Sequence, residues 1–126
     1  DEVPLSKSTP HKITWEGRQA KRYGSDAPFV QRLSNGVLYL SWSPYLEDHY
    51  VVLGVVSKSG NIFGPWEHFD RPLFEDNGGH AMFFDDANGR KIMCIHAPEC
   101  PMKERAHLYH MLEDGNSLNI ISELPI

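Results

Sequence analysis

The sequence repeats one order of short β-forming runs twice, with a period of about 50 residues. The runs are rich in β-branched and aromatic residues, turn residues separate them, and helical periodicity is nearly absent, which is typical of an all-β fold. The first run of each unit is followed by an Asn-Gly turn, which favours a hairpin. The eight expected strands are residues 27–32, 37–43, 50–57 and 66–69, then 80–84, 91–97, 106–113 and 118–122.

Four strands per unit at this period indicate blades of a β-propeller. We predict two four-stranded antiparallel blades packed face to face, one in residues 25–76 and one in 77–126, after an irregular N-terminal segment, 1–24. Repeat units do not bury their faces alone, and propellers have about 4–8 blades. We therefore expect a portion of a larger protein, with missing N-terminal blades or self-association covering the outer apolar faces. The alternative is a single eight-stranded sandwich.

Composition and charge restrict the kinds of binding partner that the chain can have. The 126 residues are 40% hydrophobic and 23% charged, as in a globular domain. The net charge of −5 without a basic stripe argues against nucleic acid, and no apolar run approaches the roughly 20 residues of a membrane helix. Cys94 and Cys100 make no disulfide framework, and Cys94 is expected to be a small core residue. The sequence begins without methionine, and we expect a mature or cut product.

Four separated motifs carry a family resemblance: SDAPFVQRLSNGVLYLSWSP, SGNIFGPWE, PLFEDNGGHAMFF and IHAPECPMKER. In order and spacing, over roughly residues 24–122, they resemble the C-terminal part of family 43 glycoside hydrolases. These enzymes are five-bladed β-propeller β-xylosidases, α-L-arabinofuranosidases and arabinanases. The resemblance implies hydrolysis of O-glycosidic bonds in arabinose- or xylose-containing plant polysaccharides by inversion. It also implies no organic cofactor and an extracytoplasmic location, periplasmic or secreted.

The resemblance implies a mechanism with two carboxyl groups about 6.5–9.5 Å apart, one the general acid and the other the general base. A third carboxylate tunes the acid. The base and this third group belong to blades that precede the segment, so the segment alone is expected to be inactive. The acid position matches Asp26, where the family has Glu. Because Asp is one methylene shorter and can simply cap a turn, a non-catalytic carbohydrate-binding or structural propeller segment stays open.

Other positions carry further expectations. The resemblance places His80 at the central channel of the propeller, reaching a calcium or other cation largely through water, although Ca²⁺ prefers oxygen ligands; the alternative is a structural histidine. Arg105 matches a family arginine that reaches sugar hydroxyls or the site carboxylates. Trp42 and Phe29 could offer a flat face to a sugar, but an aromatic residue in a strand is more often core. His96 lies near a strand end, where it could line the pocket.

Overall fold

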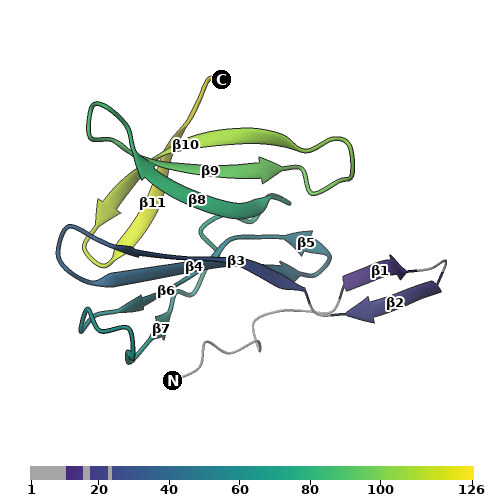
Figure 1. The fold of residues 1–126 in the computed structure, drawn as a ribbon, viewed down its shortest axis with the longest axis horizontal. Helices are drawn as coiled ribbons and strands as arrows, with labels where there is room; N and C mark the ends of the chain where they lie inside the picture. The colour runs from purple at the N-terminus through teal and green to yellow at the C-terminus, as the bar shows by residue number, and fades with distance from the viewer. Residues whose placement is uncertain (1–10, 16–17, 23) are drawn as a thin grey trace.

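The computed structural model describes residues 11–15, 18–22 and 24–126, and in this part of the chain every regular element is a strand (Figure 1). No helix in the described residues is long and apolar enough to cross a membrane. The strands are β1 (His11–Trp15), β2 (Arg18–Arg22), β3 (Ser25–Arg32), β4 (Leu38–Leu46), β5 (His49–Tyr50), β6 (Leu53–Ser57), β7 (Glu67–His68), β8 (Gly79–Asp85), β9 (Lys91–Ala97), β10 (Arg105–Asp114) and β11 (Ser117–Leu124).

The N-terminal part of the chain differs from the prediction. Residues 1–24 were expected to be irregular, but β1 and β2 pair as an antiparallel hairpin with the register Trp15↔Arg18. Figure 1 shows this hairpin beside the two main sheets. Its strands are mostly polar and lack a clear hydrophobic alternation, which is the signal that identifies a strand from sequence. Residues 1–10 lie outside the described part of the chain.

The first sheet, called the first blade, has the strand order β3-β4-β6-β7. A fifth strand, β5, pairs only with β4 and lies outside this linear order. The expected third strand, 50–57, is therefore divided. Its first residue belongs to β5, and the remainder forms β6 after an isolated bridge between Val52 and Phe74. The division follows from a tight hairpin between Leu46 and His49, which the sequence analysis took for a loop.

The second sheet, called the second blade, has the order β11-β10-β9-β8, with every neighbouring pair antiparallel. β9 has the predicted bounds, and the other three strands are each longer than predicted by two or three residues in total. The predicted all-β fold of two antiparallel blades is thus confirmed, with β5 as an additional strand on the first.

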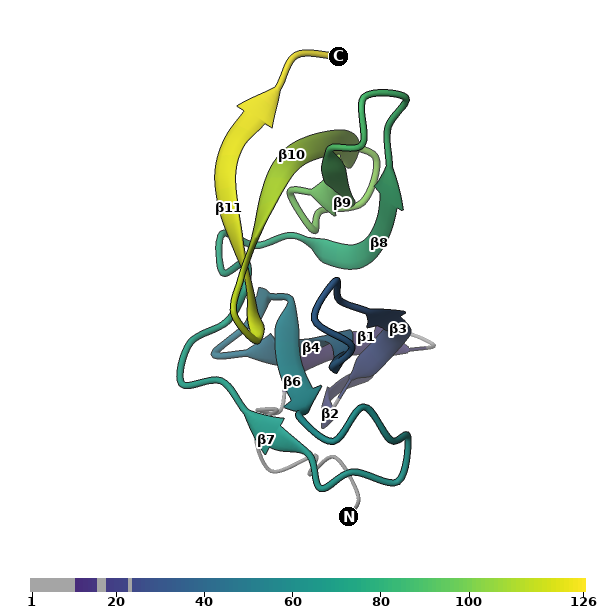
Figure 2. The ribbon, with the colours of Figure 1, turned by 90° about the vertical axis from the view of Figure 1, so that its left-hand side faces the viewer.

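The main core lies between the two blades, which Figure 2 shows stacked one above the other. Strand alternation sends Tyr39 and Val56 of the first blade toward Phe83 and Met93 of the second, and all four are buried. Burial of these apolar side chains supplies most of the free energy that holds the two blades together, at roughly 25 cal/mol per Å² of apolar surface buried. It also brings the first strands of the two blades, β3 and β8, into contact.

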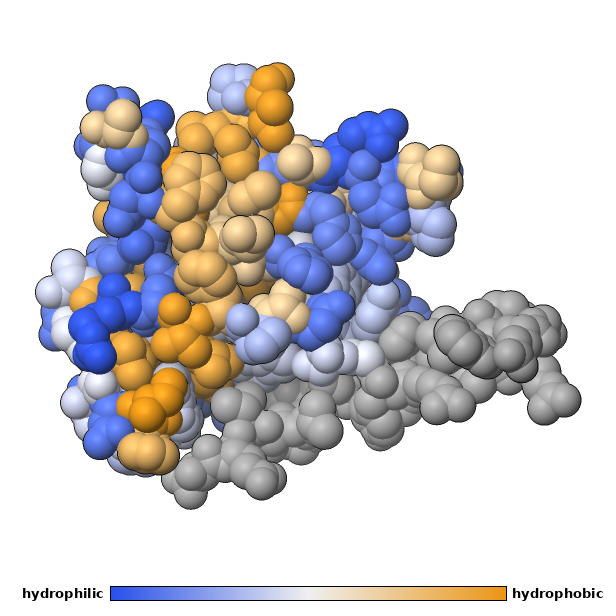
Figure 3. All heavy atoms as spheres, in the orientation of Figure 1, coloured by the Kyte–Doolittle hydropathy of each residue, from blue (hydrophilic) through white to orange (hydrophobic). Residues whose placement is uncertain are grey.

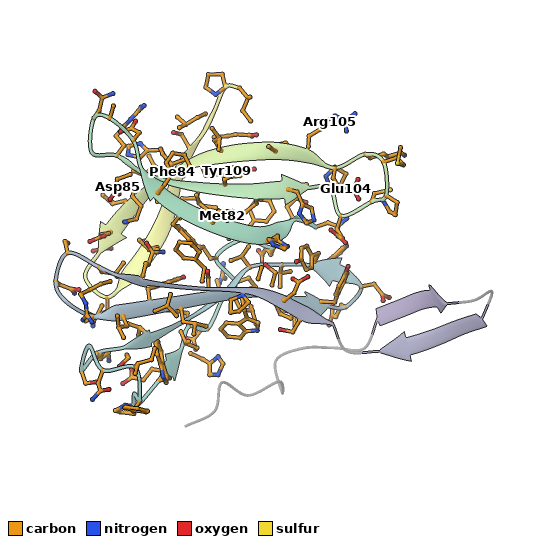
Figure 4. The ribbon with its side chains drawn as sticks, in the orientation of Figure 1. Met82, Phe84, Asp85, Glu104, Arg105 and Tyr109 are labelled. Atoms are coloured by element: carbon orange, nitrogen blue, oxygen red, sulfur yellow. The ribbon has the colours of Figure 1, made fainter. Side chains whose placement is uncertain are left out.

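The outer faces of the two blades differ. The outer face of the first blade carries a second buried cluster, formed by Trp42, Val51, Leu53 and Val55. On the second blade, large apolar side chains point away from the main core and are exposed: Met82 59%, Phe84 47%, Leu112 52% and Ile121 51%. Figure 3 shows a band of hydrophobic residues over this blade, and Figure 4 labels Met82 and Phe84 on β8. We call these four residues the open face.

Candidate functional site

Asp26 lies at a β-bulge near the start of β3. Its register partner is Ser43 of β4, and the regular pairing resumes only at Phe29. Within the bulge, Ala27 has a φ of 53°, a left-handed conformation that is unfavourable for a residue with a Cβ. Bulges and such strained residues re-aim side chains and cluster near functional sites. The backbone therefore turns the Asp26 carboxyl out of the regular strand alternation.

Tyr50 donates a short hydrogen bond from its hydroxyl to Oδ1 of Asp26. The β4–β5 hairpin holds Tyr50 directly opposite Tyr45, with ring centroids 5.0 Å apart. The two-residue turn of this hairpin, Glu47 and Asp48, has positive φ at both positions, as a type I′ turn requires. Tyr50 thus fixes the Asp26 carboxyl group through Oδ1.

A second carboxylate, that of Glu99, lies beside the same two tyrosines. The Tyr45 hydroxyl donates to Glu99 Oε1 at 2.9 Å, and Nε2 of His96 forms a short hydrogen bond with Glu99 Oε2. The His96 ring stacks on Tyr50 with a centroid distance of 5.4 Å and an interplanar angle of 20°. The cluster thus joins Asp26, Tyr45 and Tyr50 of the first blade to His96 of the second blade and Glu99 of the loop after it.

Burial and the neighbouring carboxylates keep both tyrosines protonated. Burial is the first cause that raises the pKa of Tyr50 well above its ordinary value, followed by the hydrogen bond to Asp26. Burial also raises the pKa of Tyr45, with the hydrogen bond to Glu99 second. Each hydroxyl therefore acts as a hydrogen-bond donor to its carboxylate throughout the neutral range.

His80 lies at the matching bulge of β8. It has a φ of 59°, its backbone N–H donates to Ser43 Oγ at 2.8 Å, and its exposed side chain lies with its ring centroid 6.1 Å from that of His96. The two glycines that precede His80 lie in crowded positions. A Cβ on Gly79 would lie 2.5 Å from Tyr50 Cε1, and one on Gly78 would lie 2.7 Å from the Ala97 Cβ.

Arg105 is the first residue of β10 and is exposed. Its Nη1 donates to the Glu104 carbonyl at 2.7 Å, and Figure 4 shows both residues at the same end of the second blade. A shallow pocket of about 260 Å³ is lined by Arg105 together with His80 and His96. The structure therefore brings these three predicted residues to one surface, next to the tyrosine pair.

Phe29 and Trp42 lie elsewhere. Phe29 is half-buried against the main core, with its ring centroid 5.6 Å from that of Phe83. Trp42 is 7% exposed and belongs to the second cluster on the outer face of the first blade. Both side chains pack as core aromatics, because strand alternation directs them away from the site. Their contact with a sugar stays a prediction that no contact in the described residues supports.

The residues present do not by themselves fit a calcium ion. His80 is the one expected ligand, and the described residues hold no group of three or more His, Cys, Asp or Glu side chains that could bind a metal. Ca²⁺ takes six to eight oxygen ligands. His80 alone does not make such a site, and calcium binding stays a prediction.

Sequence reasoning missed Tyr45, Tyr50 and Glu99. A signal for the tyrosines exists in YLEDHY, where a two-residue turn at the acidic pair would place them opposite each other. Glu is a poor choice for positive φ and the pair lacks the Gly that usually marks such a turn, so the pattern does not stand out. Glu99 follows His96 by three residues through a proline, and nothing local indicates that its carboxylate turns back to the imidazole.

Three solved structures match this fold. The endo-arabinase from Bacteroides thetaiotaomicron VPI-5482 has a TM-score of 0.75 and 33% identity, over 89% of this chain and 39% of that one. An endo-1,4-β-xylanase from the same organism has a TM-score of 0.66 and 20% identity, over 90% and 42%. A thermostable family-43 glycoside hydrolase has a TM-score of 0.64 and 17% identity, over 79% and 36%. No protein-family model and no curated protein matches the sequence.

These likenesses define a class of fold: two blades of a propeller of the glycoside hydrolase kind. The resemblance to family 43 glycoside hydrolases that the motifs predict is confirmed. At 17% and 20% identity the likeness is one of fold alone, whereas the endo-arabinase shares a third of its aligned residues. The chain spans about two fifths of the length of each of these proteins.

Proposed function

We propose that this chain is the C-terminal, two-blade part of an inverting glycoside hydrolase that acts on arabinose- or xylose-containing polysaccharides. The observation that carries the proposal is the position of Asp26 at the bulge of β3, with one carboxyl oxygen held by Tyr50. The 33% identity to an endo-arabinase over most of this chain supports the substrate class. The likeness to an endo-xylanase supports the fold alone.

Asp26 is the proposed general acid. Its Oδ2 would donate a proton to the glycosidic oxygen as the bond to the anomeric carbon breaks, while water attacks that carbon from the opposite face. The base that takes the proton from water would come from the preceding blades, so the 126-residue chain alone is expected to be inactive. Arg105, His80 and His96 would contact sugar hydroxyls from the shallow pocket. The proposal therefore predicts a parent chain with a mass well above the 14.4 kDa of these 126 residues.

The leaving group tests this assignment. General acid catalysis contributes about 10²–10⁴-fold, so Asp26→Asn in the full-length chain should lower hydrolysis of an alkyl pentoside by about that factor. A nitrophenyl pentoside needs little protonation of its leaving group and should lose much less. Asp26→Glu should keep or raise activity, because it restores the reach of the longer family residue.

Equal losses on both substrates, or no loss on either, would remove Asp26 from the role of acid. The chain would then be better described as a non-catalytic carbohydrate-binding propeller segment, which the Asp in place of Glu leaves open. A full-length wild type that binds arabinan or xylan oligosaccharides in calorimetry but hydrolyses neither pentosides nor polysaccharide would establish that alternative directly.

A further inference from the structure

Tyr50 is held between two other rings, and both of these are anchored by one residue. The Tyr45 ring lies 5.0 Å from the Tyr50 ring, and the His96 ring lies 5.4 Å from it. Glu99 accepts a hydrogen bond from each of these neighbours, through Oε1 from Tyr45 and through Oε2 from His96. Both oxygens of the carboxylate are therefore used to fix rings that contact Tyr50.

The backbone of Glu99 is tied to the same tyrosine. Its N–H donates to the carbonyl oxygen of Asn77 at 2.8 Å, and Oδ1 of Asn77 accepts from the Tyr50 N–H at 3.2 Å. The Glu99 and His96 side chains are 29% and 31% exposed, so solvent reaches this network only in part. Hydrogen bonds thus hold both the side chain and the backbone of Glu99, and the groups that make these bonds in turn contact Tyr50.

We propose that Glu99 is a positioning residue for the proton donor Asp26, an inference that rests on the proposed function. Glu99 holds the rings of Tyr45 and His96, these rings hold Tyr50, and the Tyr50 hydroxyl holds Oδ1 of Asp26. The protonated carboxyl group of Asp26 then presents Oδ2 in one orientation. Proton transfer is sensitive to such placement, because a displacement of about 1 Å can cost up to about 10²-fold in rate.

The alternative is that Glu99 only ties the blades together. Glu113 makes a matched control, because it also links the two blades, at the far end of β3. Its Oε2 accepts from both the backbone N–H and the hydroxyl of Ser34. Glu113→Gln removes the same charge from a contact between the blades but touches neither tyrosine, so it reports the structural effect alone.

The test measures kcat and KM of the full-length enzyme on an alkyl and a nitrophenyl pentoside. Glu99→Gln should lower kcat on the alkyl substrate about tenfold, since general acid catalysis is only partly lost, and should change the nitrophenyl kcat and both KM values by less than about twofold. Tyr45→Phe, which removes a single donor to Glu99, should give a smaller loss of the same kind. Glu113→Gln should leave the ratio of the two kcat values unchanged.

A double-mutant cycle completes the test. In the Asp26→Asn background, Glu99→Gln should cause no further loss on the alkyl substrate, because the group it positions is gone. Full additivity, or equal losses on both substrates for Glu99→Gln and Tyr45→Phe, would overturn the positioning role while leaving the proposed function intact. A wild-type enzyme that hydrolyses neither pentosides nor polysaccharide would overturn the proposed function and this inference with it. If Glu99→Gln does not fold, Tyr45→Phe alone decides.

Discussion

The two blades repeat one backbone but carry different chemistry. The first strand of each blade, β3 or β8, has a bulge that contains a left-handed residue. These residues are Ala27 in the first blade and His80 in the second, 53 residues apart. The same spacing relates the glycines of the two following turns, Gly36 and Gly89, and each closes its turn by donating to a carbonyl three residues earlier at 2.9 Å. The repeat predicted from the sequence therefore extends to individual hydrogen bonds.

The side chains at equivalent positions diverge. Asp26 of the first blade corresponds to Gly79 of the second, and their cross-strand partners are Ser43 and His96. Glycine is needed at the second position because the Tyr50 ring occupies the space of a Cβ there. The comparison teaches that the bulge is a repeated device that aims side chains at one end of the blades, while the residues placed on it set the chemistry.

The largest effect should come from filling that space. Gly79→Ala would put a methyl group 2.5 Å from Tyr50 Cε1 and 2.8 Å from Ser43 Oγ, and we expect a loss of about 3 kcal/mol in the free energy of unfolding. Gly89→Ala is the control, because a Cβ there meets nothing within 4 Å and suffers only from the φ of +75°, at about 1 kcal/mol. Urea denaturation measures both. Equal losses would mean that Tyr50 does not require the glycine.

The outer faces of the blades give the next prediction. We expect the 126-residue chain to self-associate through the open face of the second blade, since exposed apolar patches of this kind mark interfaces. Met82→Glu with Phe84→Glu should weaken association at least about tenfold, or about 1.4 kcal/mol, in sedimentation equilibrium. Ile62→Glu with Phe63→Glu, on exposed residues of the first blade, is the control. A wild-type chain that stays monomeric at high concentration would contradict this use of the face.

A pH series compares tyrosines of the two blades. Burial raises the pKa of Tyr39, which is 2% exposed, and raises that of the half-buried Tyr109 less. Unfolded tyrosines ionise near pH 10 while the folded ones stay protonated, so this stability is complete below pH 10 and falls above it. The slope for Tyr39 should approach about 1.4 kcal/mol per pH unit. Tyr39→Phe should flatten thermal stability between pH 10 and 11 more than Tyr109→Phe, and an unchanged slope would refute this.

The smallest effects on the free energy of unfolding should come from glycine substitutions at the two left-handed bulge residues, Ala27 and His80. In an ordinary strand, Ala→Gly costs about 0.5–1 kcal/mol, and Ala106→Gly on β10 should show that loss. At Ala27 the same change relieves the strain of the left-handed backbone, so the free energy of unfolding should stay level or rise by about 0.5 kcal/mol. His80→Gly should behave in the same way. A loss at Ala27 equal to that at Ala106 would show that the bulge is not strained.

Much of the fold could be predicted from local patterns. All eight expected strands exist, because alternation of apolar residues and Asn-Gly turns are strong short-range signals. The hairpin of β4 and β5 was missed because Glu47 is unusual at positive φ and no Gly follows it. The β1–β2 hairpin was missed because its residues are mostly polar.

The site could be predicted only in part. His80, His96 and Arg105 line one shallow pocket, and Asp26 is connected to His96 through Tyr50, whereas the roles of all four stay predictions. Phe29 and Trp42 pack as core residues, which depends on the face that each strand buries. The contacts of Glu99 with Tyr45 and His96 join segments from two blades, and such contacts arise from tertiary packing that no local pattern encodes.

The central claim is that this chain completes an inverting glycosidase. Its most direct test is a proton NMR time course of the full-length chain acting on a β-xylobioside or an α-arabinobioside, which follows the anomeric signals as hydrolysis begins. The account predicts that the product with inverted configuration appears first and mutarotates later, and that Asp26→Asn slows its appearance. A first product with retained configuration, or no hydrolysis of either substrate, would contradict it.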